Sequence, residues 1–208
     1  MKVLLINGSP RPKGCTARAL REVAETLQKE GIETEILQVG SKPVRGCIAC
    51  GTCEKNGKCV FDDIVNEAAK KFEECDGLVV GSPVYYGSAN GNLISFLDRL
   101  FYSTGFDKKM KAGASVVSCR RGGNTATFDE LNKYFTISEM PVVSSRYWNM
   151  VHGFTEEDVE KDLEGLQTMR ILARNMAFLI KAIQLGKDKF GMPETEENKY
   201  FTSFPDGK

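Results

Sequence analysis

The stretch MKVLLINGSPRPKGCT, residues 1–16, joins a short apolar run to a loop rich in glycine and hydroxyl groups. Residues 3–6 are all apolar, as expected for a strand that is covered on both faces. The loop begins at Gly8, and a helical pattern follows from Ala17 to about Lys29. A buried strand that leads through a tight loop into a helix predicts an anion site, because unpaired backbone N–H groups and the positive end of the helix dipole converge there.

Three side chains of this loop strengthen the prediction of an anion site. Ser9 and Thr16 supply hydroxyl donors, and Arg11 supplies a forked cation suited to phosphate. An ordinary strand-to-helix turn with a solvated arginine explains the same residues equally well. The loop matches neither the three-glycine dinucleotide fingerprint nor the Gly-Lys-Ser/Thr nucleotide loop, which disfavours a nucleoside triphosphatase.

The balance of charge limits the classes of partner. The 208 residues include 28 Lys and Arg and 28 Asp and Glu, so we expect neither nucleic acid nor an anionic membrane as a partner. No apolar run approaches the roughly 20 residues that span a bilayer, and the N-terminal run is too short for a signal peptide. We therefore predict a cytoplasmic protein, in which seven cysteines indicate metal or redox chemistry rather than structural disulfides.

Strand and helix patterns alternate along the chain. Strands are expected at residues 3–7, 32–39, 77–80, 114–118 and 141–145. Helices are expected at residues 16–29, 62–75, 89–102, 125–138 and 155–184, the last with a capping box at its start. This order predicts an α/β fold with a doubly wound, five-stranded parallel sheet and helices on both faces, in one domain over residues 1–185.

The remaining residues, 186–208, form a polar tail that carries aromatic side chains. These are Phe190, Tyr200, Phe201 and Phe204. Disordered tails are usually poor in aromatic residues, so we expect this one to dock on its own domain or on a partner subunit.

Loops that follow parallel strands meet at the carboxyl edge of an open sheet, where ligands bind at the point at which strand order reverses. The loop after the third strand offers Pro83, Val84, Tyr85, Tyr86 and Gly87. The loop after the fourth strand offers Ser118, Arg120, Gly122 and Gly123. Together with the anion loop, these residues suit a flat aromatic ring system joined to a phosphate, which is the chemistry of flavin mononucleotide. Tyrosines that pack at an interface, and a solvated Arg120–Arg121 pair, are the alternatives.

Four cysteines, Cys47, Cys50, Cys53 and Cys59, fall within thirteen residues. Compact runs at two-residue gaps let one loop surround an iron–sulfur cubane, whereas zinc usually takes two well-separated pairs, and His152 is the single histidine of the chain. A metal at this loop is therefore predicted to be a [4Fe-4S] cluster. Thiols that pack or stay free are the alternative. Cys75 and Cys119 lie beside apolar strands and are expected to be inert core thiols.

These motifs together resemble a known family. Gly8-Ser9-Pro10-Arg11 with Thr16-Ala17, and Gly81-Ser82-Pro83-Val84-Tyr85-Tyr86, are similar to the NAD(P)H-dependent FMN reductases of the flavodoxin-like superfamily. The four-cysteine loop, followed by Asp62-Asp63, resembles the branch that contains the iron–sulfur flavoproteins. The resemblance covers about residues 1–150.

The resemblance implies a sheet of order 2-1-3-4-5, a homodimer or homotetramer, and bound FMN. It implies that reducing equivalents pass from NAD(P)H through FMN to a quinone, a flavin or another acceptor. It places the phosphate on Ser9, Arg11, Cys15, Thr16 and Ala17, the ring on residues 83–87, and the polar edge of the ring at Ser118 and Gly123. Cys15 stands where the family more usually has a small polar residue.

No side chain is assigned a catalytic role, because the flavin itself performs the chemistry. Arg120 or Arg121 is expected to favour the extra phosphate of NADPH. His152 could donate a proton over the flavin, although a surface or packing role explains it as well. The alternative function is a non-catalytic FMN carrier, with or without the cluster, that acts between protein partners; a binding domain without flavin is a third reading.

Overall fold

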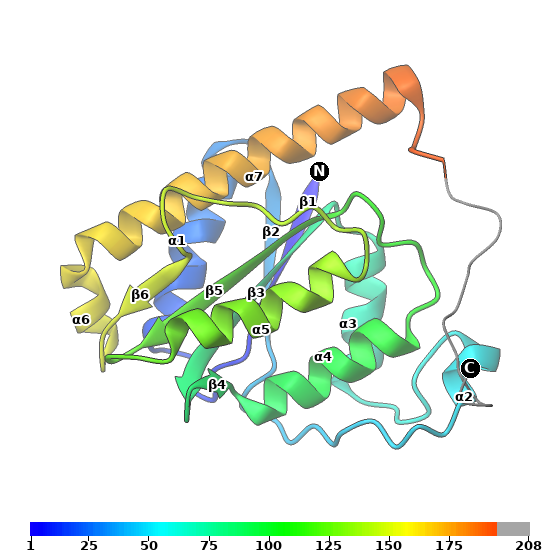
Figure 1. The fold of residues 1–208 in the computed structure, drawn as a ribbon, viewed down its shortest axis with the longest axis horizontal. Helices are drawn as coiled ribbons and strands as arrows, with labels where there is room; N and C mark the ends of the chain where they lie inside the picture. Colours follow the sequence, from blue (N-terminus) through cyan, green and yellow to red (C-terminus); the bar gives the residue numbers. More distant parts are fainter. Residues whose placement is uncertain (195–208) are drawn as a thin grey trace, which may run out of the picture.

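Parallel strands form the central sheet of the computed structural model, which describes residues 1–194 (Figure 1). Their order is β2-β1-β3-β5-β6, and a short strand, β4, pairs antiparallel with the end of β3. Without β4 this is the predicted order 2-1-3-4-5, so the expected flavodoxin-like fold is confirmed. The strands are β1 (Lys2–Asn7), β2 (Glu33–Gln38), β3 (Gly77–Tyr85), β4 (Ser88–Ala89), β5 (Ala112–Cys119) and β6 (Met150–His152).

Helices cover both faces of the sheet, and each face has its own apolar core (Figure 1). One face carries α1 (Cys15–Lys29), α6 (Glu156–Lys161) and α7 (Leu163–Phe190). The other carries α3 (Ile64–Glu73), α4 (Gly91–Ser103) and α5 (Asn124–Thr136). A short helix that the sequence did not predict, α2 (Thr52–Asn56), interrupts the cysteine loop. Within residues 1–194, none of the helices combines the length and apolar character that a membrane-crossing segment needs.

The edge strand beyond β5 differs from the prediction. In the expected strand at residues 141–145, only Val142 pairs with the sheet, through a single bridge to Gly113, and the ladder resumes where Val117 pairs with Met150. The edge segment spans more residues than β5 does between these two pairs, so the extra residues loop out. Tyr147 and Trp148 of this loop are exposed. A short segment such as residues 141–145, with apolar residues at 141–143, cannot be distinguished by local pattern from a paired strand.

The predicted helix at residues 155–184 is two helices. The capping box is confirmed at the start of α6, where the Asp158 carboxylate accepts from the Thr155 amide at 3.2 Å. The helical path breaks at Asp162, whose carboxylate accepts from the Gly165 amide at 2.9 Å and starts α7. Helix α7 then continues to Phe190, past the expected end at residue 184. The other tail aromatics, Tyr200, Phe201 and Phe204, lie outside the described residues.

A buried carboxylate joins α1 to α7. Glu22 accepts from Arg170 Nη1 at 2.5 Å and lies 2.9 Å from Arg18 Nη1. Burial has the largest influence on the pKa of Glu22 and raises it, but the hydrogen bonds from Arg170 and Arg18 outweigh burial and lower the pKa below its ordinary value. The two arginines therefore stabilise the ionised form, and Arg170 holds α7 against α1.

We expect Glu22→Gln to lower the free energy of unfolding at pH 7 by about 1–3 kcal/mol, because a buried charged acceptor that serves two arginine donors is lost. A lowered pKa contributes stability above the unfolded pKa and loses it as pH falls through the folded pKa. The difference from the wild type should therefore shrink below about pH 4.3, the ordinary pKa of Glu. Urea unfolding at several pH values measures it. Glu25→Gln, on the exposed side of the same helix, is the control, and equal losses for both variants would contradict the prediction.

Candidate functional site

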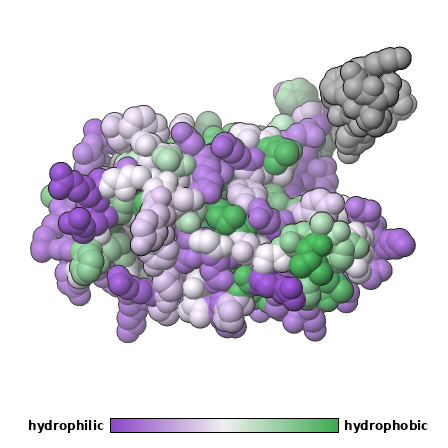
Figure 2. Space-filling model, turned by 60° about the horizontal axis from the view of Figure 1, so that its bottom comes forward, coloured by the Kyte–Doolittle hydropathy of each residue, from purple (hydrophilic) through white to green (hydrophobic). Residues whose placement is uncertain are grey.

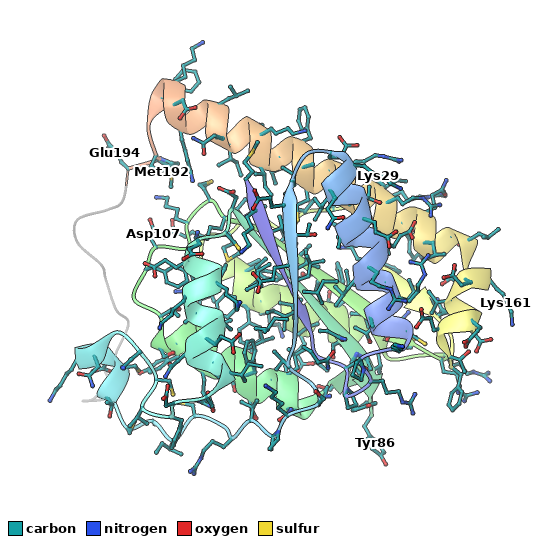
Figure 3. The ribbon with its side chains drawn as sticks, turned by 180° about the vertical axis from the view of Figure 1, so that it is seen from behind. Lys29, Tyr86, Asp107, Lys161, Met192 and Glu194 are labelled. Carbon is teal, nitrogen blue, oxygen red and sulfur yellow. The ribbon has the colours of Figure 1, made fainter. Side chains whose placement is uncertain are left out.

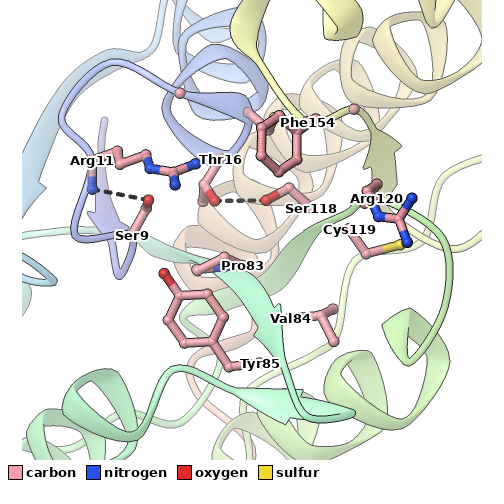
Figure 4. A pocket seen from close by; sticks show the side chains of 13 residues that line it. Ser9, Arg11, Thr16, Pro83, Val84, Tyr85, Ser118, Cys119, Arg120 and Phe154 are labelled. Atoms are coloured by element: carbon pink, nitrogen blue, oxygen red, sulfur yellow. Dashed lines mark hydrogen bonds between the residues drawn. The ribbon is translucent and has the colours of Figure 1, made fainter.

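The loop after β1 and the carboxyl ends of β3 and β5 meet in one pocket at the carboxyl edge of the sheet (Figure 4). The β1 loop and the first turn of α1 supply one wall, the end of β3 a second and the end of β5 a third. A segment just after β6 completes the pocket. The lining residues are Ser9, Arg11, Gly14, Cys15, Thr16, Pro83, Val84, Tyr85, Ser118, Cys119, Arg120, Gly153 and Phe154.

The N-terminus of α1 presents unpaired donors to this pocket. Gly14 is the N-cap and supplies no side-chain cap, and the first turn contains no acidic residue. The amides of the first helical residues, Cys15 to Ala17, therefore have no helical acceptor. The positive end of the helix dipole adds to these donors, so the turn suits an anion.

A buried polar network holds the β1 loop in place. Asn7 accepts from the Ser9 amide at 3.1 Å and donates to Gln38 Oε1 at 2.6 Å. Gln38 in turn donates to the Ser9 carbonyl at 2.6 Å, which ties the loop to β2. The Ser9 hydroxyl accepts from the Arg11 amide at 3.1 Å and so shapes the turn from within (Figure 4).

Two hydroxyls, one from α1 and one from β5, meet at the base of the pocket. Thr16 Oγ1 and Ser118 Oγ lie 2.7 Å apart, and both residues are buried (Figure 4). Thr16 belongs to α1 and Ser118 to β5, so this hydrogen bond joins the first and third walls. The sequence pattern placed both residues at the site but could not show that they touch.

Of the residues that were predicted to contact a ring, residues 83–85 belong to the end of β3 rather than to a loop. Pro83, Val84 and Tyr85 line the pocket, whereas Tyr86 projects into solvent (Figure 3). Tyr86 and Gly87 form the two-residue turn between β3 and β4 with φ of 53° and 79°. Such a turn requires positive φ at both positions and normally takes Asn or Gly first, so the hairpin imposes this backbone conformation on Tyr86.

The residues at the end of β5 and in the loop after it are divided in the same way, into those that line the pocket and those that do not. Cys119 and Arg120 line the pocket, whereas Gly122 and Gly123 are not among the lining residues. Gly123 has φ of 88°, and a Cβ there would lie 2.8 Å from Gly87 Cα. The absence of a side chain at Gly123 therefore lets the loop after β5 pack against the β3–β4 turn. Gly123 was predicted to contact the ring itself, whereas here it positions the two loops.

Cys15 and Phe154 join the pocket to the segment after β6. The Cys15 thiol donates to the Thr155 carbonyl at 3.2 Å, and burial raises the pKa of this thiol. The Phe154 ring faces the pocket opposite Tyr85 (Figure 4). Phe154 was not predicted, because nothing in the local sequence distinguishes it from an exposed loop residue that precedes a helix cap.

Asn90, the N-cap of α4, is a second residue that the sequence analysis missed. Its side chain accepts from the Asn92 amide at 2.9 Å and donates to the Gly8 carbonyl at 2.8 Å. Its own amide donates to Ser82 Oγ at 3.0 Å. Asn90 therefore connects the β1 loop with β3. An asparagine at the start of a predicted helix signals a cap, and only the fold reveals this second use.

The four cysteines of the cysteine loop line one small cavity of about 20 Å³, together with Tyr102 of α4. Cys47 and Cys50 are exposed, and Cys53 and Cys59 are half-buried. Hydrogen bonds with Thr52 lower the pKa of the Cys50 thiol. Four thiols in one cavity are the donor set that an iron–sulfur cluster takes. In the described part of the chain, however, no three or more potential ligands are already arranged as a metal site, so the loop would have to close around a cluster.

The other candidate residues lie apart from the pocket or on its wall. Cys75 is buried, and burial raises the pKa of its thiol to about 11. Cys119 is also buried, with a raised pKa, but it forms part of the pocket wall. His152 ends β6, outside the lining residues, with its Nε2 3.3 Å from Asn124 Nδ2.

The pocket residues fit FMN in chemical kind. Unpaired amides of α1, two hydroxyls and the Arg11 cation suit a phosphate group. Pro83, Val84 and the rings of Tyr85 and Phe154 offer apolar walls for an aromatic ring system.

Comparison with known proteins gives a consistent result. The family model described as NADPH-dependent FMN reductase matches residues 1–155. An iron–sulfur flavoprotein of Methanocaldococcus jannaschii is 36% identical over 192 residues, which cover 88% of this chain and 100% of that protein. The crystal structure of RosB with bound 8-demethyl-8-formylriboflavin-5'-phosphate is similar at a TM-score of 0.70 and 14% identity, with 99% of this chain and 93% of that chain covered. An archaeal flavodoxin is similar at a TM-score of 0.58 and 14% identity, with 87% and 99% covered.

Proposed function

The chain belongs to the NADPH-dependent FMN reductase family, and from this premise we propose that it passes reducing equivalents from NAD(P)H through bound FMN to a quinone, a flavin or another small acceptor. Membership makes the chain an FMN-dependent oxidoreductase. The donor and the acceptor are the proposed part. The observation that carries the proposal is the single pocket in which the unpaired N-terminus of α1, the Thr16–Ser118 pair and the aromatic wall meet.

FMN would supply hydride and electron transfer, and the chain's own residues bind and orient it. The amides of α1 and the Ser9 and Thr16 hydroxyls would hold the phosphate. Arg11 is exposed at the rim and adds positive charge there. Tyr85 and Phe154 would exclude water from the ring on two sides, since both rings line the pocket. Rigid backing by Asn7 and Asn90 keeps these loops in place, which limits reorganisation on binding.

The proposed preference for NADPH can be assigned to one of two neighbouring arginines. Arg120 lines the pocket, whereas Arg121 is exposed outside the lining residues. We expect Arg120→Gln to raise KM for NADPH about tenfold without a comparable rise for NADH, because one charge-assisted contact contributes about 1.5 kcal/mol. Steady-state kinetics with both cofactors measure this, with Arg121→Gln as the matched control. Equal rises for NADPH and NADH would contradict it.

A second function, electron transfer through FMN and a [4Fe-4S] cluster to a protein partner, is favoured by the four cysteines that share one cavity. The M. jannaschii relative is named an iron–sulfur flavoprotein, and this chain spans its whole length. A carrier should be reduced quickly by a partner protein and only slowly by NAD(P)H. A reductase should turn over with NAD(P)H in the presence of a quinone or free flavin.

An anaerobic visible spectrum, with iron and acid-labile sulfide assayed on the same sample, tests both functions. A flavin spectrum with rapid bleaching by NADPH supports the reductase. A further dithionite-bleached shoulder with about four irons per chain supports the cluster. No flavin, even after addition of FMN, would overturn the proposed function. A flavin spectrum without iron would overturn only the cluster.

A homodimer or homotetramer is proposed as the working form. Figure 2 shows one face on which hydrophobic side chains form separate patches in a hydrophilic surface. Tyr86 and Phe154 are exposed beside the pocket, and Trp148 is exposed in the loop before β6, which supports packing against a second copy. Light scattering on the purified chain distinguishes a dimer or tetramer from a monomer, and a monomer would contradict this proposal.

A further inference from the structure

Helix α4 carries a polar stripe along which the cysteine loop runs. Asn92, Ser95, Arg99 and Tyr102 are spaced at helical intervals and lie on one side of the helix. The Asn92 side chain accepts from the Val44 amide at 2.7 Å and donates to the Lys42 carbonyl. A Cβ at Gly46 would lie 3.9 Å from Ser95 Oγ, and Tyr102 Oη donates to Glu54 at 3.4 Å. The loop is therefore held by α4 at several points between residues 42 and 54.

Arg99 is the buried member of this stripe, with 1% of its surface exposed. Its guanidinium makes a two-pronged ion pair with Asp63, with Nη1 2.7 Å from Oδ2 and Nη2 2.9 Å from Oδ1. The remaining N–H groups turn to the cysteine loop. Nε and Nη2 each lie 3.2 Å from Cys59 Sγ, and Nη1 donates to the Arg45 carbonyl at 3.3 Å. The planar fork of an arginine allows these contacts at once, which the single ammonium of a lysine cannot do.

Cys59 is held more firmly than Cys47 and Cys50. Its amide donates to Asn66 Oδ1 at 3.1 Å, and its carbonyl accepts from Asn66 Nδ2 at 3.0 Å, so both backbone groups are fixed to α3. Its sulfur accepts from Arg99. Cys47 and Cys50, in contrast, are exposed on a segment without helix or strand. One ligand of the set is therefore placed in advance, whereas Cys47 and Cys50 lie on a part of the loop that must close.

We propose that Arg99 is a positioning residue that fixes Cys59 Sγ as the preset ligand of the cysteine loop and, once a cluster is bound, donates two N–H···S hydrogen bonds to that ligand. The inference rests on the proposed iron–sulfur site. Hydrogen bonds to a ligating sulfur withdraw electron density from it and help to set the reduction potential of a cluster. Helix α4 begins beside the pocket, where its N-cap Asn90 bonds to the Gly8 carbonyl, and runs toward α2 (Figure 1). It therefore fixes the position of Cys59 with respect to the pocket.

The decisive variant is Asp63→Asn/Arg99→Gln, which removes both charges of the pair and so leaves no unpaired buried ion. Asp63→Asn alone is the matched control, because it keeps the Arg99 donors to Cys59. After anaerobic loading with ferrous iron and sulfide, we expect the double variant to bind iron about 10–100-fold more weakly than the wild type, as measured by competition with a chelator. Losses of this size are typical when a group that supports a metal ligand is removed. Its cluster potential, followed by electron paramagnetic resonance in a redox titration, should shift to more negative values. The control keeps both N–H···S donors and loses a negative charge beside them, so its potential should not move to more negative values.

A double variant that retains iron and keeps the wild-type potential would overturn the inference while the proposed cluster stands. If the wild-type chain takes up no iron and sulfide, the proposed cluster is wrong. The positioning role of Arg99 is then tested on the chain without a cluster. Alkylation of each cysteine, mapped by mass spectrometry at about pH 9.5, where ordinary thiols are largely ionised, reports accessibility. Slow alkylation of Cys59 that accelerates severalfold in the double variant, with Cys47 and Cys50 unchanged, supports the fixed sulfur. Equal rates for Cys59 in both chains would overturn it.

Discussion

Replacement of Gly123 by alanine should weaken FMN binding about tenfold or more. Gly123 has φ of 88°, a backbone conformation that costs a residue with a side chain about 1–3 kcal/mol. The new Cβ would also lie 2.8 Å from Gly87 Cα and 2.9 Å from Val84 Cγ1, so the β5 loop and the β3–β4 turn must separate. Val84 lines the pocket, and its displacement would disturb the wall expected to hold the ring. Titration of the flavin-free chain with FMN, followed by flavin fluorescence, measures the change.

The neighbouring glycine supplies the control for this prediction. A Cβ at Gly122 would have no atom within 4 Å, and the residue has no positive φ. Gly122→Ala should therefore leave FMN affinity within about twofold of the wild type, since a surface substitution away from special features changes free energy by about 0.5 kcal/mol or less. If both variants bind FMN as the wild type does, close packing of the two loops is not needed for the cofactor site.

Asp63→Asn should lower the free energy of unfolding by about 3 kcal/mol, because removal of one partner leaves a buried charge uncompensated. Arg99 is 1% exposed and pairs with both carboxylate oxygens. Asparagine keeps the other role of this residue, since Asp63 Oδ1 also accepts from the Val65 amide at 3.0 Å and caps α3, and asparagine caps helices as well as aspartate does. The variant therefore separates the charge from the cap. Urea unfolding monitored by circular dichroism measures the loss.

Asp107→Asn is the matched comparison for the charge effect. The Asp107 carboxylate also accepts from a backbone amide two residues on, at 2.8 Å, but it lies on an exposed loop. We expect a loss of less than about 1 kcal/mol there, as for exposed charges in general. The double variant Asp63→Asn/Arg99→Gln should recover part of the stability lost by Asp63→Asn, because no buried charge remains. A loss at Asp63 as small as that at Asp107 would show that the Arg99 charge is effectively solvated.

The parts of the fold that local pattern predicted well are those with strong periodicity. The strand at residues 3–7, the helix that follows it and the capping box at Thr155 lie where the sequence indicated. The wrong predictions concern short segments whose sequence is compatible with two local structures. Residues 141–145 carry a strand pattern but form only one bridge, because the ladder resumes at Met150. The break at Asp162 was missed because helical spacing continues on both sides of it.

The candidate site divides in the same way. Ser9, Thr16, Tyr85 and Ser118 were predictable because a parallel sheet brings the carboxyl ends of its strands, and the residues that follow them, to one edge. Tyr86 was predicted beside them, yet the hairpin turn directs it to solvent. The direction of the Tyr86 side chain depends on the type of turn, which the sequence of residues 83–87 does not predict.

The order of strands and helices, the anion-binding turn and the soft donor set of the cysteine loop follow from residue type and spacing, which act over a few neighbours in the chain. The pairing of Arg99 with Cys59 and Asp63, and the place of Phe154 and Asn90 at the pocket, depend on the tertiary structure. The hydrogen bonds among them join residues that are 36 to 82 positions apart in the chain, which no local pattern can predict. Only the packed sheet and its helices bring such groups within hydrogen-bonding distance.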